Sequence, residues 1–100
     1  GPDARTVADV VTGKAALKGK SVLVRGQVVK VNNGIMGKNW LHLRDGSGSA
    51  EKQDNDITVT TTDVVAKGDV VTIRGKVALD QDFTAGYACP VMLEGAKVIK

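Results

Sequence analysis

The chain has 100 residues, of which 42% are hydrophobic and 25% are charged, and its formal net charge is +3. This length and composition are typical of one small globular domain and argue against a disordered chain. One cysteine and one histidine exclude an intramolecular disulfide and a zinc site built on several histidines, and no apolar run approaches the ~18 residues of a membrane span.

The first two residues, Gly1 and Pro2, are typical of what remains after a protease removes a purification tag. We therefore expect a single domain over residues 3–100. The chain has no initiator methionine, and we interpret this start as the mature part of an exported, periplasmic protein that has lost a leader or anchor. The alternative is a domain cut from a longer cytoplasmic chain.

A helix is predicted over about residues 6–18. Thr6 is a suitable N-cap, and Asp9 follows three residues later near the positive end of the helix dipole. Gly13 lies inside this segment and weakens the helix by about 1 kcal/mol relative to alanine. Apolar residues recur at helical spacing, namely Val7, Val10, Val11 and Ala15.

From residue 21 onward the apolar pattern has a period of two, which is typical of strands. It predicts five strands, over about residues 21–31, 39–45, 57–61, 70–79 and 90–99. The segments 32–37, 46–56 and 80–88 have loop composition, and 62–67 is expected to form a brief helical turn.

Glycines allow bends in three of these strands, at Gly26, Gly75 and Gly95. Five strands with such bends fit a small closed barrel. We predict a mainly β fold, a five-stranded Greek-key OB-fold barrel over about residues 21–99 preceded by one N-terminal α-helix. An SH3-like barrel and a small open sandwich are the alternatives.

Three segments resemble the anticodon-binding OB domains of class II aminoacyl-tRNA synthetases. They are Val24-Arg25-Gly26-Gln27-Val28, then Asn39-Trp40-Leu41-His42-Leu43-Arg44-Asp45-Gly46-Ser47-Gly48, and Gly68-Asp69-Val70-Val71-Thr72-Ile73-Arg74-Gly75-Lys76-Val77. Two further strings resemble small stand-alone bacterial barrels that are exported or lipid-anchored and nucleic-acid-binding-like. These are Gly34-Ile35-Met36-Gly37-Lys38-Asn39-Trp40 and Asp82-Phe83-Thr84-Ala85-Gly86-Tyr87.

OB-fold ligands usually lie across the second and third strands. If Leu41 and Leu43 fill the barrel, then Trp40, His42 and Arg44 lie on its outer face, because strand neighbours alternate. The resemblance gives Trp40 the place of a base-stacking aromatic. The alternative is that Trp40 covers a barrel end or packs under the 32–38 loop. Other candidate ligand-binding residues are Arg25, Lys38, Thr58, Thr60, Phe83 and Tyr87, with Lys30 and Gln27 beside them.

The first functional hypothesis is a non-enzymatic, monomeric module that binds single-stranded nucleic acid or an oligonucleotide on this face. Acidic residues in the flanking loops oppose strong binding of a polyanion, namely Glu51, Asp54, Asp56, Asp80 and Asp82. The second hypothesis is an exported domain that uses the same barrel to bind a protein partner. No catalytic motif, cofactor fingerprint or P-loop occurs, so no enzyme activity or cofactor is expected.

Soft metal ligands are few and are not clustered at ligand spacing: Met36, His42, Cys89 and Met92. Copper binding is therefore a minor alternative, and we expect Met92 in the core, His42 on a solvated strand and Cys89 as a small buried residue. The segment 54–56 is too short for a calcium loop and lacks its glycine and distal glutamate. We expect no metal site.

Overall fold

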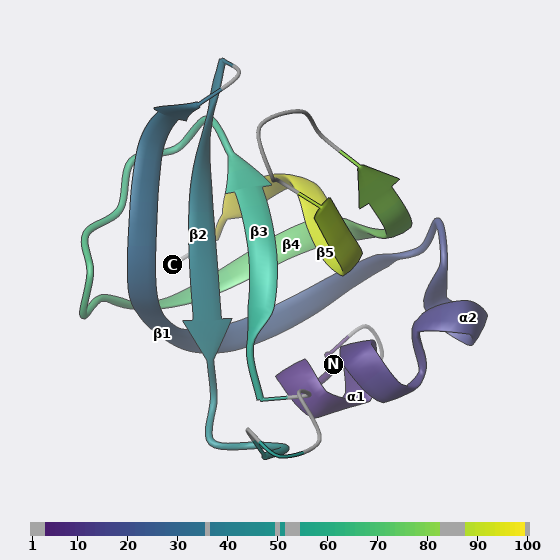
Figure 1. Cartoon of the computed structure of the whole chain (residues 1–100). Helices are drawn as coiled ribbons and strands as arrows, with labels where there is room; N and C mark the ends of the chain where they lie inside the picture. Colours follow the sequence, from purple (N-terminus) through teal and green to yellow (C-terminus); the bar gives the residue numbers. More distant parts are fainter. Residues whose placement is uncertain (1–3, 36, 50, 52–54, 83–87, 100) are drawn as a thin grey trace.

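The computed structural model describes residues 4–35, 37–49, 51, 55–82 and 88–99, although only the backbone is described at 80–82 and 88–90. Five strands form a closed barrel in the order β1-β2-β3-β5-β4. Their bounds are Ser21–Ile35 for β1, Lys38–Arg44 for β2, Ile57–Thr61 for β3, Val70–Asp82 for β4 and Ala88–Val98 for β5. The barrel closes through the parallel pair β3–β5 and through β1–β4 (Figure 1). The predicted closed five-stranded barrel is confirmed.

β1 is long enough to take part in both halves of the barrel. Its first part pairs with β4, from Ser21 to Gln27, and its second part pairs with β2, from Gln27 to Ile35. Gly26 lies at this change of partner, where a Cβ atom would come within 2.9 Å of the carbonyl oxygen of Arg44. A glycine is therefore needed there for the close approach of β1 and β2.

The N-terminal segment forms two short helices, α1 (Val7–Thr12) and α2 (Lys14–Leu17), at the end of the barrel opposite the β1–β2 hairpin (Figure 1). Thr6 is the N-cap of α1 as predicted: its hydroxyl accepts from the Asp9 N–H, and the Asp9 carboxylate accepts from the Thr6 N–H. The prediction of one continuous helix over 6–18 is wrong. The chain leaves the helical conformation at Gly13, the residue with the lowest helix propensity in the segment.

The barrel interior follows the period-two pattern of the strands. Val7 and Val10 of α1 are fully buried against it and close one end. The main strand residues of this buried apolar core are Val22, Val24, Val28, Leu41, Leu43, Ile57, Val59, Ile73, Val77 and Leu93. A second, smaller apolar cluster contains Trp40, Ala78 and Met92, with Ile35 packed against it. Met92 is buried, as expected.

Three segments differ from the sequence prediction by more than two residues or in type, while the bounds of β2 and β5 shift by one or two residues. Residues 32–35 continue β1 instead of forming a loop, because they pair with β2 through Asn32–Trp40 and Ile35–Lys38. Residues 62–67 form bends and a turn and not a helical turn. β4 extends to Asp82, beyond the expected end at Leu79. Phe83, Tyr87 and the rest of 83–87 lie outside the described residues.

Candidate nucleic-acid interface

Three rows of side chains cross the outer face of β1, β2 and β3, and we call this the β1–β3 face. Cross-strand pairing gives the rows Gln27–Arg44, then Lys30–His42–Thr58, then Asn32–Trp40–Thr60. Side chains paired in this way point to the same side of a sheet. The first two rows are exposed or half-buried, whereas Trp40 and Thr60 are buried. The sequence therefore placed His42, Arg44 and Thr58 on one face correctly.

The expectation of an exposed Trp40 is wrong, because only 1% of this residue is accessible. Its ring packs with Ala78 and Met92, and its Nε1–H donates to the carbonyl oxygen of Ile35 at 2.9 Å. The alternative drawn from the sequence, packing beneath the segment 32–38, is the one that the structure adopts. A base cannot stack on a ring that is covered in this way.

Thr60 is also buried, with 1% exposure, and its hydroxyl oxygen accepts a hydrogen bond from the N–H of Gly95 at 3.2 Å. It therefore does not lie on the accessible part of the β1–β3 face. Thr58 stays half-buried between His42 on β2 and Met92 on β5. Of the two threonines predicted as ligand contacts, only Thr58 is accessible from this face.

His42 and Arg44 share one carboxylate. Asp56 lies 2.8 Å from Nδ1 of His42 and 3.2 Å from Nε of Arg44. The Arg44 side chain remains 54% exposed, so its remaining N–H groups face solvent. The sequence predicted that acidic residues of the segment 51–56 oppose binding of a polyanion. Asp56 is one of them, and it offsets part of the positive charge on the face.

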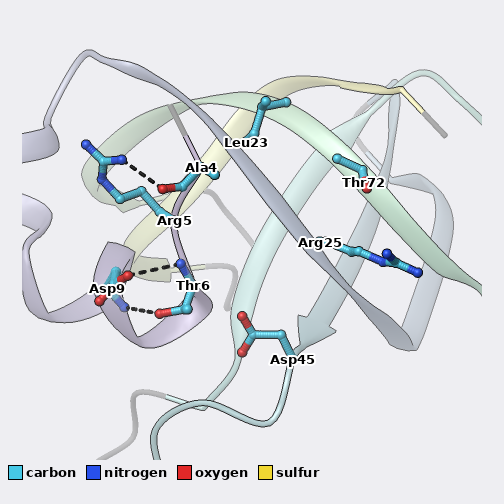
Figure 2. Close-up of a pocket in the computed structure, with 8 residues that line it drawn as sticks. All are labelled: Ala4, Arg5, Thr6, Asp9, Leu23, Arg25, Asp45 and Thr72. Carbon is cyan, nitrogen blue, oxygen red and sulfur yellow. Dashed lines mark hydrogen bonds between the residues drawn. The ribbon is translucent and has the colours of Figure 1, made fainter. Parts of the chain in front are cut away.

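Arg25 and Lys38 lie at the margins of the β1–β3 face. Arg25 lies in the first part of β1, which pairs with β4, and its partner there is Thr72. Figure 2 shows its guanidinium extending away from the carboxylate of Asp45. Lys38 opens β2 opposite Ile35 at the hairpin end of the barrel. The two cations closest to the centre of the face are Lys30 and Arg44.

Two shallow hollows border Arg25. One, of about 380 Å³, separates the N-terminal segment from β1 and β4 and is lined by Ala4, Arg5, Thr6, Asp9, Leu23, Arg25, Asp45 and Thr72 (Figure 2). The other, of about 690 Å³, joins Arg25 to the β1–β3 face and is lined by Arg25, Gly26, Gln27, Val29, Arg44, Asp45, Gly46 and Val70.

The Asp45-Gly46-Ser47 motif serves the N-terminal helix. The Asp45 carboxylate accepts from the N–H of Val7 at 2.9 Å and from the N–H of Ser47 at 3.0 Å, and the Ser47 hydroxyl donates to it as well. The Ser47 hydroxyl oxygen also accepts from the N–H of Ala8 at 3.0 Å. Two first-turn N–H groups of α1 are therefore capped by a loop about 40 residues away, while Thr6 caps a third.

These bonds also set the charge state of Asp45. Burial raises the pKa of this carboxyl, but the hydrogen bonds from Ser47 and from the N–H of Val7 outweigh burial, and the pKa lies below its ordinary value. Asp45 is therefore a firmly ionised structural group. Its charge is directed at the helix and not at a ligand.

Of the four soft-metal candidates, the structure describes the side chains of His42 and Met92, and each has another role. Met92 is buried in the small apolar cluster, and His42 is paired with Asp56. The side chains of Met36 and Cys89 lie outside the described residues. Within the described part of the chain, no group of three or more histidine, cysteine, aspartate and glutamate side chains could hold a metal ion. None of the helices described there has the length and apolar composition that a membrane span requires.

Solved structures with the same barrel include two synthetases. The chain is similar to a protein provisionally described as an aspartyl-tRNA synthetase from Leishmania major Friedlin (TM-score 0.66, 16% identity, covering 96% of this chain and 20% of that one). It is also similar to the asparaginyl-tRNA synthetase of Entamoeba histolytica (TM-score 0.59, 16% identity, covering 99% of this chain and 24% of that one). The barrel is an OB-fold. The chain spans only a fifth to a quarter of these synthetases.

A third solved structure is similar over most of both chains. It is provisionally described as a nucleic acid-binding lipoprotein from Klebsiella pneumoniae (TM-score 0.57, 28% identity, covering 89% of this chain and 77% of that one). No protein-family model and no curated protein matches the chain. Both resemblances indicated by the sequence motifs are thus confirmed as likenesses to known structures.

Proposed function

We propose that the chain is a non-enzymatic binding module that contacts the backbone of single-stranded nucleic acid. The contact surface is the accessible part of the β1–β3 face, extended by Arg25 along β1. The observation that carries this proposal is the placement of Lys30 and Arg44 in adjacent rows beside Gln27, His42 and Thr58. The description of the Klebsiella protein as nucleic acid-binding supports the same class of ligand.

Charge supplies the affinity in this proposal. Each phosphate that a lysine or arginine neutralises releases bound counterions, and the affinity then falls as the salt concentration rises. Lys30, Arg44 and Arg25 provide three such contacts, and Asp56 offsets part of Arg44. With so few contacts and Trp40 buried, we expect a dissociation constant of about 10–100 μM at physiological salt, at the weak end of the usual range of non-specific binding, and tighter binding at low salt.

The test is the fluorescence anisotropy of a labelled eight-nucleotide oligothymidylate at low salt. Lys30→Gln removes an exposed cation from the centre of the face, and Lys18→Gln makes the same charge change at the exposed C-terminus of α2. We expect Lys30→Gln to weaken binding about threefold or more and to lower the salt slope by about 0.7, whereas Lys18→Gln leaves both unchanged. Equal effects of the two variants, or no binding at low salt, would overturn the proposal.

Interaction with a protein partner is the second candidate function. It is supported by the exposed Val70 in the hollow that contains Arg25 and Arg44, which gives this hollow an apolar side. The lipoprotein description of the Klebsiella protein supports export, where a protein partner is a more natural ligand than nucleic acid. Fractionation of cells that make the full-length protein tests this location, since recovery in the cytoplasm would contradict it.

We further propose that the module acts as a monomer. The barrel is closed through β1–β4 and β3–β5, so the strand segments paired there offer no free edge to a second copy. Sedimentation at two protein concentrations tests this, and a mass that rises to twice the chain mass would contradict it.

A further inference from the structure

A third hollow lies at the hairpin end of the barrel, away from the helices. Its volume is about 260 Å³. The turn between β1 and β2, the end of β3 and the C-terminal part of β5 line it. Its lining residues are Gly37, Lys38, Thr60, Thr61, Thr62, Gly95, Ala96 and Lys97. Lys38, at the margin of the β1–β3 face, is among them, whereas Arg25, Lys30 and Arg44 are not.

The lining of this hollow carries positive charge only. Lys38 and Lys97 contribute two cations, and no carboxylate is found among the described residues that line it. The two hollows beside Arg25 differ in this respect, because Asp45 lines both of them. A hollow with cations and hydroxyl groups but no acid favours an anion.

Lys97 also faces a like charge across the sheet. It pairs directly with Arg74 in the antiparallel register of β4 and β5. Like charges placed opposite each other on neighbouring strands destabilise the sheet. A bound anion next to Lys97 would place an opposite charge beside this pair of cations.

A buried hydroxyl donor completes the site. The Thr60 oxygen accepts from the N–H of Gly95, and within the described part of the chain its own proton is donated to no group. Since Thr60 is 99% buried and lines the hollow, a ligand there is the natural acceptor for that proton. The neighbouring Thr61 hydroxyl, in contrast, donates to the carbonyl oxygen of Ala96 at 2.7 Å.

We infer that this hollow binds an oxyanion of the phosphate class, held by Lys97, Lys38 and the hydroxyl of Thr60. The glycines at both sides, Gly37 and Gly95, adopt positive φ angles of 79° and 59° and carry no side chain that could cover the entrance. The ligand is either a small phosphate compound or the terminal phosphate of a nucleic-acid strand. The inference does not depend on the β1–β3 face, and the two can fail separately.

The experiment titrates the protein with inorganic phosphate at constant ionic strength. Trp40 is the only tryptophan and pairs with Thr60 across β2 and β3, so its fluorescence reports on the hollow. Amide NMR shifts of Gly95 and Lys97 give a second readout. Lys97→Gln should weaken binding about fivefold, the effect of one charge contact in water. Lys76→Gln is the matched control, because Lys76 lies opposite Glu94 and does not line the hollow.

Oligothymidylates with and without a 5′-phosphate distinguish the two sources. Tighter binding of the phosphorylated strand that Lys97→Gln abolishes identifies a strand end as the ligand. Saturable binding of inorganic phosphate with no difference between the strands identifies a small phosphate compound. The inference is overturned if neither probe gives a saturable response that Lys97→Gln weakens, or if Lys76→Gln weakens it equally. Binding of both strands that depends on Lys30 alone would overturn it while sustaining the proposed function.

Discussion

The attachment of α1 to the barrel depends on Asp45, and its removal should destabilise the whole protein. In Asp45→Ala, the N–H of Val7 loses its acceptor, and Val7 is fully buried. The Ser47 hydroxyl also loses the group that holds it beside the N–H of Ala8. A hydrogen bond to a charged group contributes about 1.5–3 kcal/mol, and an N-cap about 1 kcal/mol.

We therefore expect Asp45→Ala to lower the free energy of unfolding by about 2 kcal/mol. This is a large share of the roughly 5–15 kcal/mol that stabilises a domain of this size. The measurement is urea unfolding followed by Trp40 fluorescence, in which the midpoint should fall by about 1–2 M. Glu51→Gln is the control, since it removes one negative charge from an exposed residue.

The pH dependence gives an independent check of the same contact. The folded pKa of Asp45 is depressed below its ordinary value of 3.8, so the ionised carboxylate stabilises the fold above that value. This stability is lost as the pH falls from 3.8 through the lower folded pKa. Asp45→Asn should therefore differ most from the wild type near neutral pH and converge with it in acid. A constant difference across this range, or equal destabilisation by Glu51→Gln, would refute the reasoning.

Three further variants test other parts of the structure. Trp40→Phe removes the donor to the Ile35 carbonyl and should cost about 1–3 kcal/mol in thermal unfolding without changing oligonucleotide affinity; an unchanged Tm would contradict the burial. Gly75→Ala places a Cβ within 2.9 Å of the Leu93 Cβ and should cost about 1–3 kcal/mol in urea unfolding, and wild-type stability would contradict this close packing. Lys97→Gln should raise the free energy of unfolding by about 0.2–1 kcal/mol, because it relieves the repulsion from Arg74. Lys76→Gln loses its pairing with Glu94 and should not raise it. Equal changes in the two variants would contradict this account.

Local patterns predicted most of the barrel. The bounds of β3 follow directly from its alternating β-branched residues, and the Thr6 cap follows from the spacing of Thr6 and Asp9. The barrel itself followed from strand number and from bend-permitting glycines at Gly26 and Gly75, where the structure shows backbone and side chains in close approach. The apolar spacing, the cap and the glycines themselves are local features of the sequence, so they can be derived from it, although the contacts that need these glycines are long-range.

The features that sequence patterns missed depend on distant contacts. The alternation of residues in β2 predicts the face on which Trp40 lies. The side chains that pack on its ring belong to Met92 and Ala78, which are far away in the chain. The Asn32-Asn33-Gly34 segment has turn composition, yet cross-strand pairing of Asn32 with Trp40 keeps it in β1. In both cases tertiary packing outweighs local preference.

The same distinction explains why the synthetase-like motif indicates a fold more than a ligand. Trp40 lies in an apolar cluster, Asp45 and Ser47 cap α1, and Asn39 donates to the carbonyl of Asp63 at 2.9 Å. These motif positions serve the barrel, and a barrel with another ligand would need them equally. The accessible positions of the face include Gln27, Lys30, His42, Arg44 and Thr58. Lys30 and Arg44 can contact phosphates, while the tryptophan of the motif is buried and His42 is held by Asp56. Because phosphate contacts hold a strand without reading its bases, a ligand bound here should be recognised by its charge and not by its sequence.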